Sequence, residues 1–212
     1  LTFLHGSTDG AMTTHDRSDT SPAFETDIII VGAGFAGLGM GIQLARRKHE
    51  SFVILERNDD VGGTWRDNHY PGVACDVPSH LYSFSFRPNP NWSRVYSPGS
   101  EIKSYLLECA RDEGLLPHLY FGADMLSARW DDHTSRWRVE TPRGLFISRI
   151  LITATGHLAD EHLPQIDGLG DFPGNAFHSA RWNHDVPLQN RRVGVVGSGA
   201  SAIQIVPEMA KL

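Results

Sequence analysis

The 212-residue chain is long enough for one domain, or for one domain and part of a second. Its content of 40% hydrophobic and 21% charged residues is ordinary for a globular protein with its own core. The net charge of −6 and the lack of long basic runs argue against a nucleic-acid partner.

Other classes of protein are excluded by single features of the sequence. The cysteines, Cys75 and Cys109, are far apart, so neither a disulfide scaffold nor a CxxC redox or zinc site is expected. His178 and His184 lack the paired spacing of zinc ligands, and no GxSxG nucleophile motif occurs. No apolar run approaches the roughly 18 residues of a membrane helix, and the chain does not open on a secretory signal. We therefore expect a cytoplasmic protein without a metal site or membrane association.

The first predicted elements form one βαβ unit. Residues 1–24 are rich in Thr, Ser, Asp and Gly without periodicity, and we expect them to be a disordered lead-in. A β-branched apolar run over residues 27–31 predicts a strand buried on both faces of a parallel sheet. A mostly apolar helix is predicted over 35–48, and a second buried strand over 51–56.

The middle of the chain is predicted to be a long loop followed by a helix and several strands. Residues 61–98 show no period and are rich in Gly, Pro, Asn and aromatic residues, which favours a packed loop with a functional role. A helix is predicted over 99–113, ended by Gly114. The strands that follow are predicted at 119–121, 126–130, 137–140 and 146–155.

The end of the chain repeats the strand–turn–helix pattern of its beginning. Residues 157–190 contain Pro and Gly and are predicted to be a connector. A buried strand is predicted over 192–196, a turn over 197–199, and a helix from residue 200.

A GxGxxG pattern, Gly-Ala-Gly-Phe-Ala-Gly at residues 32–37, lies between the first predicted strand and helix. Gly32 permits a tight turn, Gly34 lets the backbone approach a diphosphate, and Gly37 lets the helix pack closely on the strand. Exposed amides and the helix dipole would hold the negative charge. Glu56 ends the second strand, where a carboxylate can accept hydrogen bonds from an adenosine ribose. The pattern predicts a dinucleotide site.

Three further motifs carry weaker signals. Residues 197–202, Gly-Ser-Gly-Ala-Ser-Ala, form a GxGxxA pattern that predicts a second dinucleotide, although an ordinary strand–helix turn is the alternative. The motif at 62–65, Gly-Gly-Thr-Trp, offers close backbone approach and a flat apolar surface, or is a packed loop. Residues 153–156, at the end of a predicted strand, either contact a ligand or simply form part of the core and the turn that follows it. Asp76, on pattern alone, is more typical of a turn or cap than of catalysis.

Together these features resemble the class B flavoprotein monooxygenases, and among them the Baeyer–Villiger monooxygenases. Phe172, Gly174, His178 and Trp182 reproduce the family pattern FxGxxxHxxxW between the two glycine motifs, with Asn183 where Pro or Asp is usual. The segments 70–76 and 82–84 are also similar to the family. The resemblance covers nearly the whole chain from residue 26.

The resemblance implies an α/β, Rossmann-like flavoprotein with two dinucleotide-binding domains, truncated in the second (NADPH) domain. It divides the chain into the lead-in 1–24, the N-terminal part of an FAD-binding domain at 25–156, a linker at 157–190, and the start of an NADPH-binding domain at 191–212. Because the chain stops inside the last predicted helix, we expect a fragment with unprotected sheet edges and poor flavin retention.

The resemblance also implies two cofactors, FAD and NADPH, and a set of residues for each. The residues expected to bind FAD are Gly32, Gly34, Phe35, Ala36, Gly37, Glu56, Arg57, Gly63, Thr64, Trp65, Tyr70, Asp76, Tyr82, Met125, Ala154, Thr155 and Gly156. The residues expected to bind NADP are Gly197, Ser198, Gly199, Ala200, Ser201, Ala202 and Gln204.

The implied reaction inserts one oxygen atom from O2 into a small-molecule ketone, giving an ester or lactone through a C4a-peroxyflavin. Asp76 would act indirectly, by positioning an arginine that this sequence does not contain. His178 and Trp182 would couple NADP binding to domain position, or simply pack in the connector. The alternatives are an N- or S-oxygenating monooxygenase of the same class and a catalytically inactive nucleotide-binding fragment. A flavin disulfide reductase would need a CxxxxC motif, which the sequence lacks.

Overall fold

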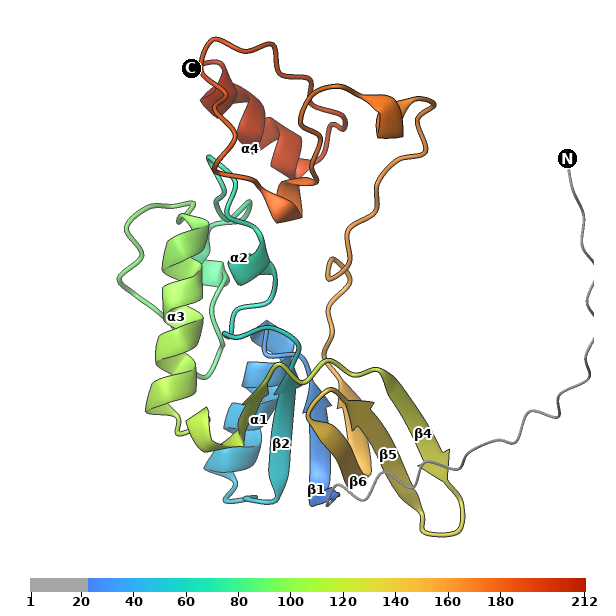
Figure 1. Ribbon diagram of the computed structural model, residues 1–212. Helices are drawn as coiled ribbons and strands as arrows, with labels where there is room; N and C mark the ends of the chain where they lie inside the picture. Colours follow the sequence, from blue (N-terminus) through green and yellow to red (C-terminus); the bar gives the residue numbers. More distant parts are fainter. Residues whose placement is uncertain (1–22) are drawn as a thin grey trace, which may run out of the picture.

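The computed structural model describes residues 23–212; residues 1–22, which hold most of the expected lead-in, lie outside the described residues. Figure 1 shows a lower part built on a sheet with helices on one side, and an upper part that ends in α4. The strands are β1 (Phe24–Val31), β2 (Phe52–Glu56), β3 (Leu119–Phe121), β4 (Ser127–Asp131), β5 (Arg136–Thr141) and β6 (Gly144–Thr153). The helices are α1 (Phe35–Arg46), α2 (Thr64–Asp67), α3 (Gly99–Asp112) and α4 (Ala200–Met209).

The strands form one six-stranded mixed sheet in the order β3-β2-β1-β6-β5-β4. The pairs β1–β2, β1–β6 and β2–β3 are parallel, whereas β4–β5 and β5–β6 are antiparallel. Parallel neighbours need a crossover connection, and α1 provides it between β1 and β2. The carboxyl ends of β1, β2 and β6 therefore meet at one edge of the sheet, where ligands bind in open α/β folds.

The central parallel strands are buried on both faces, which explains their continuous apolar runs. Alternate residues of β1 and β2 face two different cores. The core between the sheet and helices α1 and α3 includes Ile28, Ile30, Leu38, Ile42, Phe52, Ile54, Ile102 and Leu106. The core on the opposite face includes Ile29, Val31, Val53, Leu55, Ala123, Val139 and Phe146.

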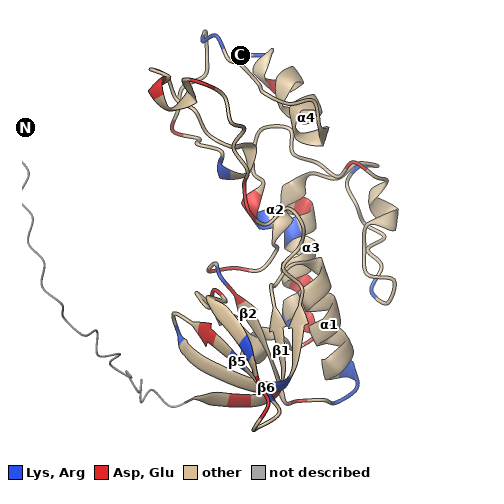
Figure 2. Cartoon of the chain, turned by 90° about the vertical axis from the view of Figure 1, so that its right-hand side faces the viewer, with Lys and Arg blue, Asp and Glu red and all other residues tan. Residues whose placement is uncertain are grey.

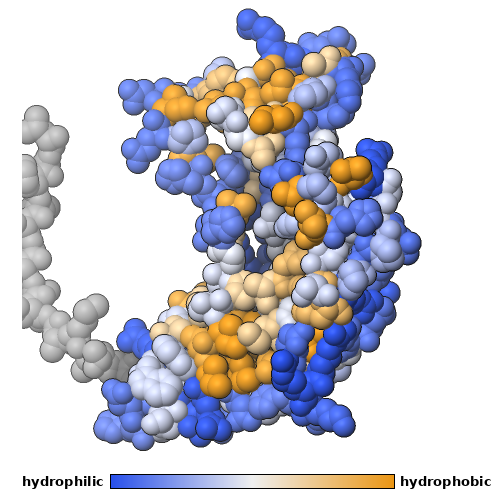
Figure 3. Space-filling model, turned by 180° about the vertical axis from the view of Figure 1, so that it is seen from behind, coloured by the Kyte–Doolittle hydropathy of each residue, from blue (hydrophilic) through white to orange (hydrophobic). Residues whose placement is uncertain are grey.

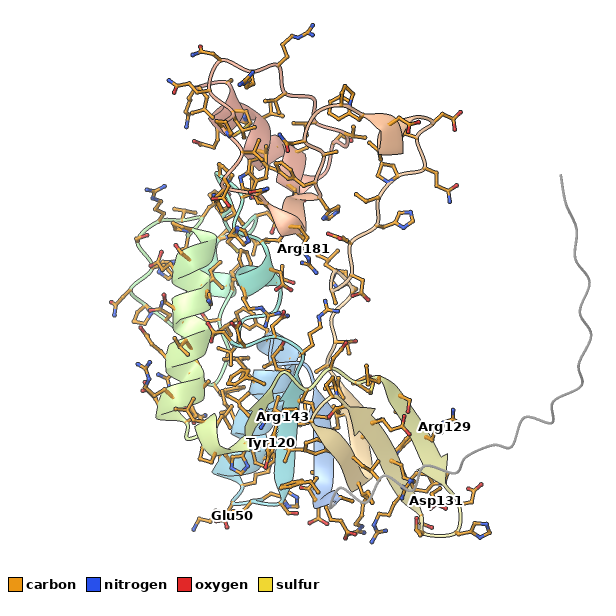
Figure 4. All side chains as sticks on the ribbon, viewed as in Figure 1. Glu50, Tyr120, Arg129, Asp131, Arg143 and Arg181 are labelled. Atoms are coloured by element: carbon orange, nitrogen blue, oxygen red, sulfur yellow. The ribbon has the colours of Figure 1, made fainter. Side chains whose placement is uncertain are left out.

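The antiparallel strands fold against this second core. Arg143, in the turn between β5 and β6, donates from Nη1 to the carbonyl oxygen of Phe121 in β3, at 3.0 Å. Figure 4 shows Arg143 near Tyr120 of β3, while Arg129 and Asp131 of β4 lie at the outer end of the sheet. The hairpin is thus tied to the far edge of the parallel strands.

The predicted Rossmann-like α/β fold and most of its elements are confirmed, with shifted ends. β1 begins at Phe24 rather than at residue 27, so the last residue of the expected lead-in already belongs to the sheet. α1 ends at Arg46 rather than 48, because Lys48 takes a left-handed backbone with φ of 59°. Gly114, with φ of 72°, follows α3 as predicted. Within the expected loop 61–98 the structure adds the short helix α2, which the sequence did not predict.

The prediction of a strand over residues 192–196 is wrong. These residues form no strand, and Val193, Val195 and Val196 are 42%, 38% and 75% exposed. A strand satisfies its backbone groups by pairing along its length. No strand within residues 23–212 pairs with this segment, so its apolar, β-branched composition alone does not produce one.

We expect Ile54→Ala to lower the free energy of unfolding by about 2–5 kcal/mol, because it empties a fully buried position of β2. The matched control is Ile203→Ala on α4, whose side chain is 69% exposed, and its effect should stay within about 0.5 kcal/mol. Urea unfolding followed by circular dichroism measures both. Equal losses in the two variants would contradict this description of the core.

Candidate nucleotide-binding site

A cavity of about 400 Å³ lies at the carboxyl ends of β1, β2 and β6. Most of the residues predicted to bind FAD line it, although they come from separate parts of the chain. They are Gly32, Gly34, Phe35, Ala36, Glu56, Arg57, Gly63, Thr64, Trp65, Tyr82, Met125, Ala154, Thr155 and Gly156.

The turn between β1 and α1 requires glycine at two positions. Gly32 has φ of 105°, and a Cβ built on it would lie 2.5 Å from the carbonyl oxygen of Ala154. A Cβ on Gly37 would lie 1.8 Å from the carbonyl oxygen of Gly32. Gly37 does not line the cavity but lies beneath the turn, where it lets α1 approach the strand.

The N-terminus of α1 is free to bind an anion. Its N-cap is Gly34, no side chain caps the helix, and no acidic residue lies in the first turn. The first amides of a helix have no partner within the helix, and the helix dipole favours negative charge beside them. Gly63 faces Gly34, since a Cβ on Gly63 would lie 3.1 Å from the Gly34 Cα. The arrangement fits a diphosphate lying against the first amides of α1, beside the contact between Gly34 and Gly63.

Glu56 is 4% exposed and joins the turn to the end of β2. Its Oε2 accepts a hydrogen bond from the backbone amide of Ala33, at 2.9 Å. Its Oε1 accepts one from the amide of Asn58, at 3.0 Å, and lies 2.9 Å from Nη1 of Arg66. A buried carboxylate is costly unless it is paired and hydrogen-bonded. Glu56 is therefore held in one orientation at the wall of the cavity.

Arg57 reaches across the cavity to the segment that follows β6. Its Nη1 lies 2.7 Å from Oδ1 of Asp160, and its Nη2 donates to the carbonyl oxygen of Ala159. The hydrogen bond from Arg57 lowers the pKa of Asp160, so the aspartate is ionised at neutral pH. This contact brings the start of segment 157–190 to the cavity wall.

Aromatic side chains form another wall of the cavity. Trp65 donates from Nε1 to the hydroxyl oxygen of Tyr82 at 3.2 Å, and their ring centroids are 5.4 Å apart in a T-shaped arrangement. Phe35 packs edge-on against Tyr82, with centroids 5.0 Å apart. Burial raises the pKa of Tyr82 above its usual range, so its phenol is neutral at physiological pH.

Tyr70 and Asp76, also predicted to bind FAD, do not line this cavity. Asp76 is exposed. The hydroxyl of Tyr70 donates to Oε1 of Gln204 at 2.9 Å, and Nε2 of Gln204 donates to the carbonyl oxygen of Ala74 at 2.9 Å. One residue predicted for FAD and one predicted for NADP therefore contact each other. These two contacts of Gln204 join α4 to the loop after α2. Figure 3 shows that the molecule is hollowed between its upper and lower parts.

The second glycine motif adopts the same turn as the first. Gly197 has φ of 124°, and Gly199 caps α4 with φ of −77° and ψ of −176°. The corresponding values are 105° at Gly32, and −85° and −166° at Gly34. The residues predicted to bind NADP lie together on this turn and helix, outside the cavity: Gly197, Ser198, Gly199, Ala200, Ser201, Ala202 and Gln204.

The cavity also contains residues that the sequence analysis missed. Val31 and Leu55 lie in the predicted strands, and Ala33 and Gly62 lie in the predicted glycine motifs, but none of the four was predicted as an FAD contact. The others are Arg66, Asp67, Ala123, Asp124, Ala159 and Asp160. Residues in this second group lie in α2 and in loops, where no periodic or motif signal marks them.

The described part of the chain offers neither a membrane-spanning helix nor a cluster of metal ligands. Among residues 23–212, no helix has both the length and the apolar character to cross a membrane. Nor does this part of the chain bring together three or more His, Cys, Asp or Glu side chains in a way that could hold a metal ion.

Comparison with known proteins identifies relatives of the chain. A sequence family described as NAD(P)-binding Rossmann-like domain matches residues 30–98. A protein of Streptomyces coelicolor named Baeyer-Villiger monooxygenase is 52% identical over 182 residues, covering 86% of this chain and 35% of the relative. The chain is homologous to the N-terminal part of Baeyer–Villiger monooxygenases.

Solved structures of other proteins share the fold. A closed crystal structure of cyclohexanone monooxygenase superposes with a TM-score of 0.83 and 32% identity, covering 90% of this chain and 37% of that one. A structure titled as the OTEMO complex with FAD and NADP gives a TM-score of 0.81 and 30% identity, covering 90% of this chain and 38% of that one. The chain thus spans somewhat over a third of the length of these Baeyer–Villiger relatives.

Gly37→Ala should lower the free energy of unfolding by at least about 1–3 kcal/mol, because its methyl group would overlap the backbone of the turn. Gly170→Ala is the control, since a Cβ there meets no heavy atom within 4 Å. Guanidinium unfolding compares the two variants. If Gly37→Ala were as stable as the control, close packing of α1 on the turn would not need glycine.

Proposed function

We propose that this chain binds the ADP portion of FAD in the cavity between β1, β2 and β6, and NADPH at the turn that begins α4. In this proposal residues 25–156 are the N-terminal part of the FAD-binding domain, 157–190 are a linker, and 191–212 begin the NADPH-binding domain. The whole enzyme would insert one oxygen atom from O2 into a ketone and release an ester or lactone. The observation that carries the proposal is the glycine turn and its uncapped helix N-terminus, placed at the wall of a cavity with Glu56 hydrogen-bonded to the turn.

The cavity residues suit the diphosphate and the ribose of an ADP group. The free amides at the start of α1 would hold the diphosphate, and Gly34 and Gly63 leave the room that it needs. Glu56 would accept a hydrogen bond from a ribose hydroxyl. The complex with FAD and NADP among the structural relatives supports this choice of cofactors.

FAD, when bound, would supply the redox chemistry with NADPH and O2. The chain's own contribution is binding, orientation and the exclusion of water. Trp65 and Tyr82 would shield the flavin-facing end of the cavity, since they form its aromatic wall. Asp76, exposed and outside the cavity, would position an arginine supplied by another part of the whole enzyme.

Gly34→Ala should weaken the binding of ADP while leaving the fold intact. A Cβ on Gly34 would lie 3.7 Å from the nearest heavy atom, Gly63 Cα, so the ligand-free chain has room for it. The methyl group would lie where the diphosphate approaches, and a steric cost of about 1–3 kcal/mol corresponds to roughly 5- to 150-fold weaker binding. Isothermal titration calorimetry with ADP gives the dissociation constants. Unchanged ADP affinity, with wild-type thermal stability, would count against the proposed diphosphate site.

The oxygenation is tested in the native protein that carries this sequence, supplied with FAD, NADPH, O2, a cyclic ketone and a thioether. We expect lactone from the ketone, with NADPH consumed in proportion. Sulfoxide from the thioether without lactone would instead assign the protein to the S-oxygenating branch of the class. Binding of FAD without consumption of NADPH would leave only the nucleotide-binding part of the proposal.

A further inference from the structure

Arg66 is a mostly buried charged residue that the proposed function does not yet use. It lies on α2, and its side chain is 11% exposed. Its Nη1 donates to the carbonyl oxygen of Asp60 at 2.6 Å and lies 2.9 Å from Oε1 of Glu56. Its Nε and Nη2 lie 2.9 and 2.8 Å from Oδ1 of Asp67. Figure 2 shows basic and acidic residues meeting around α2.

These contacts fix which oxygen of Glu56 is free to accept a ligand. An ionised carboxylate offers about four acceptor positions. Oε1 takes the amide of Asn58 and the guanidinium of Arg66, and Oε2 takes the amide of Ala33. One acceptor position on Oε2 is left, in a side chain that lines the cavity.

Arg66 also offsets part of the negative charge of Glu56 and Asp67, at a place where a further negative charge is expected. The Ala33 amide, which contacts Glu56, belongs to the same turn whose glycines would hold a diphosphate. Two negative groups in one partly enclosed cavity repel each other, and a buried carboxylate without a cation carries a large desolvation cost. A planar guanidinium can contact a carboxylate, a carbonyl oxygen and a second carboxylate at once, whereas an ammonium is a single point charge.

We infer that Arg66 is a positioning residue for the adenosine ribose. By occupying Oε1 of Glu56 and offsetting part of its charge, Arg66 leaves Oε2 as the oxygen that accepts the ribose 2′-hydroxyl. Arg66 does not itself touch the ribose. The inference rests on the proposed binding of ADP in this cavity, and it adds that recognition of the ribose depends on a residue of α2.

The test measures the ratio of the dissociation constants for 2′-deoxyADP and ADP, by calorimetry on the 212-residue chain. In the wild type this ratio should be about tenfold, because the lost hydrogen bond is one to a charged group. Arg66→Met should bring the ratio close to one and weaken the binding of ADP itself. Arg66→Lys, which keeps the charge but not the planar group, should give an intermediate ratio.

The matched control is Lys103→Met. Lys103, on α3, lies 2.7 Å from Oδ2 of Asp60, whose carbonyl oxygen Arg66 contacts, but no contact joins Lys103 to Glu56. This variant should keep the wild-type ratio. Thermal unfolding of each variant establishes that it is folded. If Arg66→Met does not fold, the role of Arg66 is judged from the ratio of the two dissociation constants measured for Arg66→Lys.

Three outcomes would overturn the inference, and they separate it from the proposed function. A wild-type chain that does not bind ADP removes the proposed function, and this inference with it. Binding of ADP with the wild-type ratio in the folded Arg66→Met variant removes the role of Arg66 but leaves the proposed function intact. An equal loss of the ratio in Lys103→Met shows that the effect comes from general loosening of the loop, and it also removes the role of Arg66.

Discussion

The close approach of α1 to β1 at the first glycine turn governs the rest of the structure. Gly37 sits so near the Gly32 carbonyl oxygen that no side chain fits between them. Because of this approach, the free N-terminal amides of α1 lie directly over the end of the strand, beside the ends of β2 and β6. The edge of a parallel sheet and the positive end of a helix dipole then coincide, and a cavity suited to an anion results.

Glu56 shows how a structural and a ligand-facing role can belong to one side chain. One of its oxygens fixes the turn through Ala33, and the other holds α2 through Arg66. The same carboxylate lines the cavity. Since both neighbouring elements depend on it, the position of Glu56 is determined by the fold before any ligand binds. Such preorganisation lowers the cost of binding, because the polar group does not have to be oriented by the ligand.

Predictions from the sequence succeeded where a local pattern encodes the structure, and failed where a distant partner decides it. The run from Asp27 to Val31 predicted a buried parallel strand because an uninterrupted apolar segment is typical of one. The glycine motif and Glu56 predicted a large part of the cavity wall, because their spacing along the chain is a local pattern too. Arg66 and Asp160 were missed, because each is a single charged residue whose place in the cavity depends on a residue elsewhere in the chain. Asp76 and Tyr70 were expected beside the cofactor through family resemblance, and they lie outside the cavity.

A comparison of the two glycine motifs shows which features depend on the local sequence and which depend on distant elements of the fold. Gly197 and Gly199 reproduce the backbone angles of the first turn, although residues 192–196 pair with no strand among residues 23–212. The turn is therefore encoded by the glycines themselves, which permit its left-handed first residue and its extended N-cap. The cavity is not encoded in this way. At the first motif its walls come from β2, α2, the loop after β3 and the segment after β6, and the cavity forms only where those elements meet the turn. Each GxGxx(G/A) motif thus specifies the backbone of its turn, and the surrounding fold determines whether a cavity forms beside it.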